Sequence, residues 1–423
     1  MNITEFADFF ALTAEERQFI IRFDFENIAG ELTKIPETLH DDFILRQLGK
    51  LRRPENANLI LQGACELKSD PYLLAGYNYL CYYWWKHPQA LLYGHKLPDF
   101  ENSRQGSENA GIYNLLVVLA GFPAVENSYA RLKLPEHYAQ DTLQYTSGAI
   151  TEYAAGHDNK LGIGSRKAHW FRFYVNGVLF RIGRFEYMMQ DPQLYLPAAY
   201  KRNSDGKVIA LCRHNWLLSK DGLRLFENDS PEKAYKTAQL QTNDSTISGI
   251  PINPNGYAQV DRKITLDLNE YTPLWSSWDL VPGLHIPGGG GMTPEAAAAS
   301  LREALEFFPR YFGRKVAAIS CFSWIFNNDF EELLPESNLT KLMQQLYLFP
   351  FASVGVEGLT FVFGRNEEDW KNFPADNSLR RAFHKLHEQN RRLKAGGMFI
   401  TPEAINNFGQ STFRKDYPSF DDL

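Results

Sequence analysis

The sequence predicts a two-domain chain: a helical domain over residues 1–160, followed by a mixed α/β domain with flanking helices over residues 161–423. Apolar residues recur at helical spacing through the first part, whereas short alternating segments and turn residues take over from about residue 165. A strand, a run of glycines and a helix start follow one another at 278–308. These observations place a sheet with packed helices in the second domain.

Helical patterns fill the first domain. A capping box at Thr13–Glu16 predicts that a helix begins there. Helical spacing continues from Leu59 to Trp85, and two further helices are predicted at Ala110–Leu119 and Ala139–Ala155. The aromatic run Cys81–Trp85 is assigned to core packing on a buried helix face in preference to a ligand site.

Strands and turns dominate the second domain. Val178–Met189 alternates apolar and charged residues, as a half-buried strand does, and Asn176-Gly177 before it is either a hairpin turn or a left-handed helix end. The polar segment 227–248 is expected to be an excursion or a partly mobile loop. The later elements are predicted as a strand Trp278–Ile286, a helix Thr293–Phe308, a strand Val316–Phe326, a helix from Ser337 that includes Leu346, a strand Leu359–Phe363, a helix Leu379–Leu393 ended by Gly396-Gly397, and a strand Met398–Ile400.

The stretch from His285 to Glu295 carries the strongest functional signal. Four glycines follow the strand, and Thr293 and Pro294 are placed to cap and start a helix. Glycines let backbone N–H groups approach a ligand, and a helix N-terminus adds free donors and partial positive charge. The loop is therefore either a phosphate site or a plain turn. The candidate cofactor-binding residues are Ile286, Gly288, Gly289, Gly290, Gly291 and Met292.

Two common phosphate ligands are disfavoured by the spacing. A P-loop requires Lys-Ser or Lys-Thr after its last glycine, where this chain has Met292-Thr293. The dinucleotide fingerprint requires spaced glycines and a later acidic residue, and the glycines here are consecutive. A third use is the pyrophosphate of coenzyme A, which GNAT-type acyltransferases hold in the loop between their fourth strand and third helix.

The order of elements from residue 178 resembles the GNAT core. His285-Ile-Pro-Gly-Gly, Leu179–Arg184, Cys321–Trp324 and Leu334–Asn338 resemble motifs of a bacterial N-acyltransferase family. That family joins a helical N-terminal domain to a GNAT-like C-terminal domain, and the resemblance covers most of the chain. It implies acyl-CoA as co-substrate and transfer of the acyl group to an amine.

Two departures from the usual GNAT pattern stand out. Ile286-Pro287 takes the place of a charged or polar residue before the glycines. The usual late helix carries Asn and then Leu-Tyr, whose hydroxyl lies near the leaving thiolate; Asn338 and Leu346-Tyr347 match this pattern with two extra residues between them. Tyr347 is therefore a catalytic candidate by resemblance.

The chemistry of acyl transfer suggests further candidates. His285 could act as the base, because its unperturbed pKa of about 6.5 suits proton transfer, or it could be a structural histidine beneath the loop. Ser323 could donate a hydrogen bond to the thioester carbonyl or simply satisfy the core. Cys321 is interpreted as a buried, inert thiol. Asp279 is either a base or part of a turn at the start of the strand.

Composition narrows the function classes. The net charge of −6 argues against a general nucleic-acid surface. The four cysteines are widely spaced, which fits reduced thiols in a cytoplasmic protein better than disulfides or a metal site. No secretory signal is apparent, and no apolar stretch approaches the roughly 20 residues that span a bilayer. We expect a small-molecule substrate and no metal, nucleic acid or membrane partner; the oligomeric state stays open.

The predicted function is an acyl-CoA-dependent N-acyltransferase with an unidentified amine acceptor. Two alternatives stay open. The second domain could be a degenerate GNAT-like domain that binds a ligand or partner without chemistry, or the chain could be a hydrolase that uses a pocket between its domains. Arg181 and Arg184 could meet the phosphates of the coenzyme, or they could form surface ion pairs.

Overall fold

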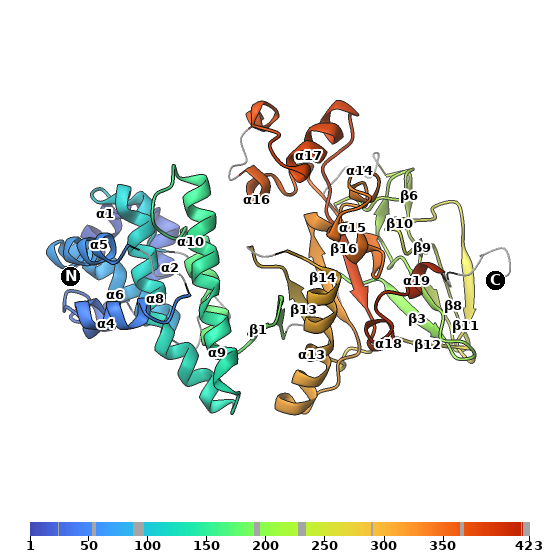
Figure 1. The fold of residues 1–423 in the computed structure, drawn as a ribbon, viewed down its shortest axis with the longest axis horizontal. Coiled ribbons are helices and arrows are strands. Elements are labelled where there is room, and N and C mark those ends of the chain that lie inside the picture. Colours follow the sequence, from blue (N-terminus) through green and yellow to red (C-terminus); the bar gives the residue numbers. More distant parts are fainter. Residues whose placement is uncertain are drawn as a thin grey trace. The chain divides into compact units, whose positions relative to one another are not determined.

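The computed structural model describes residues 1–23, 25–52, 56–87, 97–189, 195–226, 234–288, 291–363, 368–415 and 417. These residues form two compact units (Figure 1), one of Met1–Arg181 with Pro287–Gly289 and one of Ile182–Ile286 with Gly290–Leu423. A helical N-terminal region is thus followed by a mixed-sheet unit, as predicted. The helical region continues past residue 160 through two further short helices, Ser165–Trp170 and Arg172–Val175.

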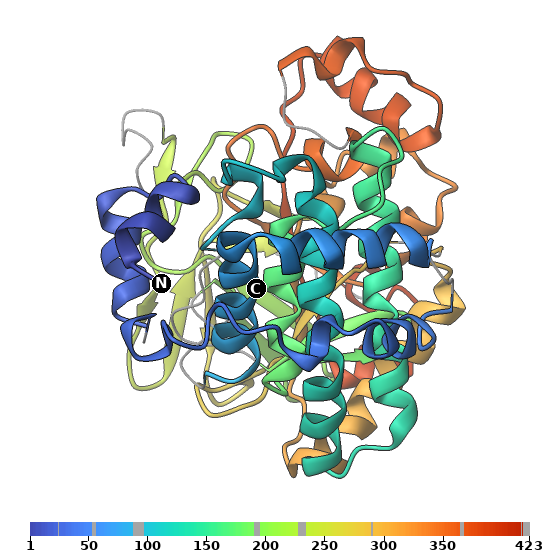
Figure 2. The same cartoon turned by 90° about the vertical axis from the view of Figure 1, so that its left-hand side faces the viewer.

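The helical unit is built around α8, which contacts α4, α5, α6, α9, α11 and α12. Figure 2 turns this unit toward the viewer. Tyr83 and Trp84 of the aromatic run on α6 are fully buried, as predicted for core packing, whereas Cys81, Tyr82 and Trp85 are only partly buried. The helices are α1 Ile3–Phe9, α2 Ala14–Ile21, α3 Phe25–Ile28, α4 Asp41–Leu48, α5 Ala57–Ser69, α6 Pro71–Trp85, α8 Ala110–Arg131, α9 Glu136–Leu143, α10 Tyr145–Gly156, α11 Ser165–Trp170 and α12 Arg172–Val175.

Helix starts were predicted well and helix breaks were not. The capping box of Thr13 and Glu16 is present at α2. The helical pattern over Leu59–Trp85 belongs to two helices, α5 and α6, because Asp70 caps a new start at Pro71. The helix expected over Ala139–Ala155 is likewise split into α9 and α10.

Helix α8 was predicted too short. It spans 22 residues and has Pro123 in its interior. The expectation that no apolar stretch is long enough to span a bilayer was wrong for this helix, which could cross a membrane by length and composition. However, 72% of its most apolar window is buried within the fold. Its apolar surface is therefore accounted for by the helices packed around it.

The second unit contains a six-stranded sheet in the order β1-β2-β13-β14-β16-β15. Its strands are β1 Leu179–Ile182, β2 Phe185–Met188, β13 Gly283–His285, β14 Ile319–Ser323, β15 Tyr347–Pro350 and β16 Gly396–Ile400. Strands β13 and β14 are parallel neighbours, and helix α13 (Pro294–Phe312) joins them in sequence. This arrangement is the predicted strand–loop–helix–strand unit.

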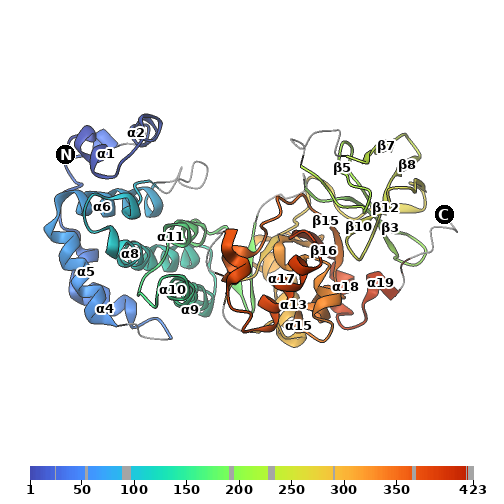
Figure 3. The same cartoon turned by 90° about the horizontal axis from the view of Figure 1, so that it is seen from above.

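Helix α13 packs on the sheet, and its apolar face buries Ala297, Leu301, Ala304 and Phe308. Figure 3 shows it beside α15, with the smaller sheets on another side of the unit. A five-stranded sheet, β10-β9-β4-β3-β12, and a three-stranded sheet, β11-β8-β7, share a core of six buried residues that includes Ile209 and Leu266. The other helices are α14 Phe330–Leu333, α15 Asn338–Met343, α16 Leu359–Phe363, α17 Ser378–Glu388, α18 Pro402–Asn406 and α19 Thr412–Lys415.

The smaller sheets occupy residues 198–273, including part of the predicted polar excursion. Residues 227–233 of that excursion lie outside the described residues, and 236–248 contribute short strands. The strands are β3 Ala198–Arg202, β4 Val208–Leu211, β5 Leu217–Leu218, β6 Lys236–Thr237, β7 Gln241–Thr242, β8 Thr246–Gly249, β9 Pro251–Asn253, β10 Tyr257–Ala258, β11 Ile264–Asp267 and β12 Tyr271–Pro273.

Several strand predictions were wrong in detail. Val178–Met189 is a hairpin, because Gly183 adopts a φ of 58° and turns the chain between β1 and β2. The segment Leu359–Phe363 is helix α16, since a short apolar run has no period that distinguishes the two structures. Gly396-Gly397 begins β16 and does not end a helix. Of the two readings of Asn176-Gly177, the left-handed helix end is correct, with φ of 64° at Gly177.

The strand before the glycines is also shorter than expected. Only Gly283–His285 is strand, and Trp278 lies in a turn with 88% of its surface exposed. Asp279 accepts hydrogen bonds from the backbone and hydroxyl of Ser276 at 2.7 and 2.8 Å. The turn interpretation of Asp279 is therefore confirmed.

Candidate functional site

The parallel strands β13 and β14 pair only at their base. Gly283 is opposite Ser320, and the backbone N–H of Ser320 donates to Pro282 O at 3.0 Å. Beyond this point β13 pairs with β2, and β14 pairs with β16 from Cys321 to Ser323. Within the described part of the sheet, the two strands therefore part at their carboxyl ends, where backbone groups are left to meet a ligand.

Helix α13 begins beside this opening and is capped as predicted. Thr293 Oγ1 accepts a hydrogen bond from the backbone N–H of Ala296 at 3.2 Å, and Pro294 occupies the first turn. The next donors of the first turn and the dipole of this 19-residue helix favour an anion at its start. Arg184 adds a cation nearby, because its Nε donates to Gly291 O at 3.1 Å.

The glycine loop is described only at its two ends. A Cβ added to Gly291 would have Thr293 Cγ2 as its nearest neighbour at 4.0 Å, so the backbone there is open. Gly288 packs with the helical unit, where an added Cβ would lie 3.9 Å from Glu152 Oε2. Lys167 pairs with Glu152 at 2.8 Å and offsets its charge. Gly289 and Gly290 lie outside the described residues.

His285 is the last residue of β13. It is opposite Glu186 on β2, a buried carboxyl residue, and directly opposite residues on paired strands point to the same face. Burial lowers the pKa of His285 to about 4, because a charged imidazolium loses its hydration there. The imidazole is therefore neutral at pH 7, able to accept a proton but only a weak base.

Ser323 is the last residue of β14 and lies on the other face of the sheet. The pairing of Gly283 with Ser320 puts His285 on the face of Ser320, while alternation puts Cys321 and Ser323 on the opposite face. Ser323 Oγ accepts a hydrogen bond from the backbone N–H of Ile325 at 3.4 Å. Cys321 is buried, as predicted, and burial raises the pKa of its thiol to about 12, which disfavours the reactive thiolate.

Tyr347 is remote from the opening. It starts β15, which is separated from β14 by β16, whereas the sequence placed it on a late helix. Helix α15 ends at Met343, because pairing of Tyr347 with Phe399 on β16 takes over. The buried hydroxyl donates to Ile252 O at 2.5 Å and accepts from the backbone N–H of Ala210 at 3.2 Å. The structure thus does not bring Tyr347 together with His285 and Ser323.

A small apolar cavity lies where β13 ends, between the sheet and helices α13 and α15. Its volume is about 10 Å³, close to the smallest space that holds one water molecule. Ile286, predicted to contact the cofactor, is one of its walls. The lining residues are Phe185, Leu284, Ile286, Leu301, Phe326, Leu342, Leu346 and Met398.

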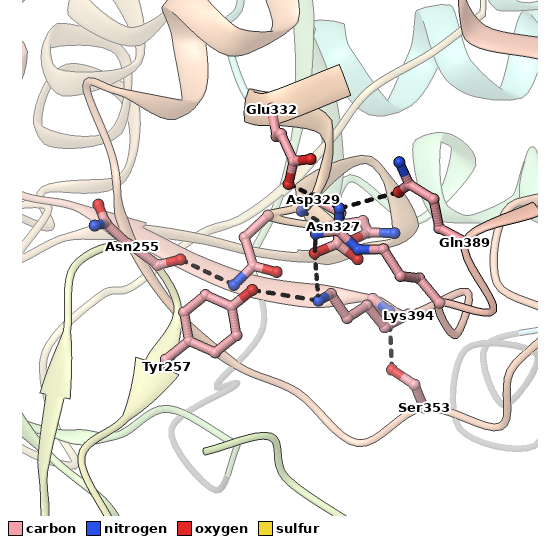
Figure 4. Close-up of polar contacts among 11 residues, drawn as sticks. Asn255, Tyr257, Asn327, Asp329, Glu332, Ser353, Gln389 and Lys394 are labelled. Carbon is pink, nitrogen blue, oxygen red and sulfur yellow. Dashed lines mark hydrogen bonds and ion pairs between the residues drawn. The ribbon is translucent and has the colours of Figure 1, made fainter. Parts of the chain in front are cut away.

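A buried polar cluster follows the end of β14 and was missed by the sequence analysis (Figure 4). Asp329 is only 4% exposed and pairs with Lys394 at 2.9 Å and with Arg391 at 2.5 Å. Lys394 Nζ also lies 3.5 Å from the hydroxyl of Tyr257. Burial lowers the pKa of Lys394, and the charge of Asp329 opposes that shift. No pattern in the sequence connects residues 329 and 394, so only the fold reveals the pair.

The cluster ties the segment after β14 to the segment before β16. Asp329 lies shortly after the short helix η5 (Trp324–Phe326), which continues directly from β14, and Lys394 lies just before β16. Ser353 adds a further tie by accepting a hydrogen bond from the backbone N–H of Ala395 at 2.8 Å. Across the described residues there is no group of three His, Cys, Asp or Glu side chains that could hold a metal ion.

Comparison with known proteins identifies the second unit. Residues 179–399, more than half of the chain, match the family model for the GNAT-like C-terminal domain. No curated protein matches the chain.

Several solved acyltransferase structures share the fold over 95% of this chain and 99% of theirs. An acyltransferase in complex with decanoyl-CoA and teicoplanin is 18% identical, with a TM-score of 0.60. A mutant acyltransferase in complex with octanoyl-CoA is 18% identical, with a TM-score of 0.62. The likeness therefore extends over both the helical unit and the mixed-sheet unit. With its second unit matched over residues 179–399, the chain belongs to the family of proteins that carry a GNAT-like C-terminal domain.

Proposed function

We propose that the protein is an acyl-CoA-dependent acyltransferase that transfers an acyl group to an amine. The observation that carries the proposal is the parting of β13 and β14 next to a glycine loop and the N-terminus of α13. An extended pantetheine chain can pair with free strand backbone, and a pyrophosphate can accept hydrogen bonds at a helix start. Solved acyltransferases of the same fold were crystallised with CoA or acyl-CoA, which supports this choice of ligand.

The acyl-CoA molecule has a candidate binding group for its pyrophosphate and another for its thioester. The backbone N–H groups from Gly288 to Met292, with the start of α13 and Arg184, would hold the pyrophosphate. The hydroxyl of Ser323 keeps its own proton, since Oγ only accepts from Ile325, and could donate it to the thioester carbonyl. A ligand between the parted strands would meet groups from both faces of the sheet.

The reaction requires one proton to leave the amine and one to reach the sulfur. The amine nitrogen attacks the thioester carbon, the carbonyl becomes an oxyanion, and its collapse breaks the C–S bond. His285 is neutral at pH 7 and would take the amine proton as attack makes that proton acidic. Because the hydroxyl of Tyr347 is bonded to Ile252 O, the proposal assigns reprotonation of the thiolate to solvent.

Thiol release from acyl-CoA tests the proposal directly. Full-length protein is incubated with acetyl-, octanoyl- or decanoyl-CoA and a panel of amines, and free thiol is followed. We expect release that depends on the amine. Bound CoA at about 100 times its Kd should also add roughly 2.7 kcal/mol to the free energy of unfolding. Absence of binding by every CoA species at millimolar concentration would contradict the proposal.

A non-catalytic ligand-binding role is the second candidate. It is favoured by the burial of Tyr347 and by the low pKa of His285, which make both candidates for proton transfer weaker. This role predicts CoA binding without thiol release. Thiol release that needs no amine would instead indicate hydrolysis.

A further inference from the structure

The helical unit contains a cavity of its own, with a volume of about 780 Å³. The end of α6, the second half of α8 and the end of α12 form its walls. Its size falls within the range of roughly 300–1,000 Å³ that is typical of small-molecule sites. None of the residues predicted for acyl transfer lines it, so its ligand needs a separate explanation.

One wall of the cavity is aromatic and rigid. Trp85 Nε1 donates a hydrogen bond to Val117 O at 2.9 Å, which fixes the indole ring. A Cβ added to Gly121 would lie 2.9 Å from that ring, so the ring rests directly on the α8 backbone. Trp84, the neighbouring wall residue, is buried. A flat apolar surface that is already ordered loses little entropy when a planar group stacks on it.

The charged side chains that line the cavity are Lys86 and Arg131. His87 also lines it, and no Asp or Glu does among the described residues. Lys86 and Arg131 make no ion pair with a carboxylate in the described part of the chain, whereas Lys50 in the same unit pairs with Glu126 at 2.6 Å. The potential at this wall is therefore positive and attracts anions.

Two amide side chains supply polar groups beside these cations. Asn127 and Asn176 both line the cavity. The amide of Asn176 is held in place, since its Nδ2 donates to Arg172 O at 2.8 Å. An anionic ligand could therefore receive hydrogen bonds from the amide groups while Lys86 and Arg131 neutralise its charge.

We propose that this cavity binds a small aromatic anion, in which a flat ring carries a carboxylate or a phosphate. The ring stacks on Trp85, and the anionic group lies near Lys86 and Arg131. A neutral ring would leave both cations without a counter-charge, and an anion without a ring would leave the aromatic wall unused. Aryl carboxylates and nucleoside phosphates share this chemistry.

Titration calorimetry on the full chain tests the proposal with defined probes. Indole-3-carboxylate represents the aryl carboxylates and AMP the nucleoside phosphates, with indole-3-carboxamide, adenosine and inorganic phosphate as matched partial ligands. We expect at least one of the two ring-bearing anions to bind to saturation. Its matched partial ligands should bind with an affinity that is lower by roughly tenfold or more. The probe that binds identifies the source of the anion.

Charge-removing variants locate the site. Arg131→Gln and Lys86→Gln should each weaken the binding of that probe roughly tenfold, because a charge-assisted contact is lost. Arg104→Gln and Lys160→Gln remove exposed cations of the same unit outside the cavity and should leave binding unchanged. The proposal is overturned if neither ring-bearing anion binds, or if the cavity variants bind like these controls. AMP binding that saturating CoA abolishes also counts against it, since AMP would then occupy the donor site.

Discussion

The segment that follows strand β13 has no charged side chains, whereas the segment that follows β14 carries Asp329, whose carboxylate forms ion pairs with Lys394 and Arg391. After His285 the chain runs through four glycines to Thr293, and the α13 start lies open beside it. After Ser323 it runs through η5 to Asp329, which Lys394 and Arg391 hold. The segment after β13 is the proposed source of backbone donors for a ligand, whereas the segment after β14 is tied to the fold by ion pairs. The contrast suggests that ligand binding is a task of the β13 side and that the β14 side keeps the gap at a fixed width.

The largest expected effect on stability comes from removing the Asp329 carboxylate, which lies after β14. Asp329→Ala leaves the buried Lys394 without its carboxylate partner and removes one of the two carboxylates that pair with Arg391, and it should lower the free energy of unfolding by about 3–5 kcal/mol. Glu332→Ala is the matched control, because Glu332 pairs with the same Arg391 but is 64% exposed. We expect about 0–1 kcal/mol for the control. Urea unfolding curves measure both, and equal losses would show that the buried pair does not fix the β14 side.

A core substitution next to the opening should come second. Leu346→Ala widens the apolar cavity at the end of β13 and should destabilise the fold by roughly 2–4 kcal/mol. If the acyl tail enters this cavity, the variant should also raise the rate with octanoyl-CoA relative to acetyl-CoA. Leu339→Ala removes a buried leucine close by in sequence that does not line the cavity. The same shift in chain-length preference in both variants would argue against an acyl tail in the cavity.

The open side should respond to pH through His285. The pKa of His285 is about 4 in the folded protein and about 6.5 in the unfolded chain. Between these two pH values the imidazole is therefore protonated in the unfolded state and neutral in the folded state. The stability that the neutral imidazole contributes is present above pH 6.5 and is lost as pH falls toward 4. Relative to His285→Gln, the wild-type protein should lose roughly 1–2 kcal/mol between pH 7 and pH 5. A constant difference between the two unfolding free energies over this range would show that His285 is not desolvated.

The smallest effect on stability is expected in the glycine loop. Gly291→Val adds a side chain in open space and should change the free energy of unfolding by less than about 0.5 kcal/mol. It should nevertheless weaken CoA binding, because the side chain blocks the approach to backbone N–H groups. Gly289→Val and Gly290→Val, at positions outside the described residues, carry the same prediction. Gly30→Val, another exposed glycine in open space, is the control. Normal CoA binding by all three loop variants, folded like the control, would make the loop a plain turn.

The open side of the site was visible in the sequence because its signals are local. Thr293 and Pro294 mark a helix start within two adjacent residues, and the glycines precede them directly. The strand–loop–helix–strand order read from the sequence is typical of parallel neighbouring strands, and β13 and β14 pair in this way. The catalytic roles of His285 and Ser323 and the cofactor contacts of the loop stay predictions.

The ion pairs after β14 were not visible in the sequence because long-range pairing creates them. Asp329 and Lys394 are 65 residues apart and meet only when β16 enters the sheet. Pairing with β16 also explains why Tyr347 was wrongly predicted to lie on a helix. Its spacing after Asn338 fits a helix, but its backbone pairs with β16 as part of strand β15. Short apolar runs were the other source of error, as at Leu359–Phe363, since such a run suits a strand or a helix.

Helix α8 has a consequence for how the chain is made. Ala110–Arg131 leaves the ribosome before α9, α11 and α12, three of the helices that later cover it. During synthesis at about 5–20 residues per second, this apolar helix of membrane-spanning length therefore has for some time only the earlier helices α4, α5 and α6 to pack against. Any delay in translation just after residue 131 would prolong the exposure of this helix.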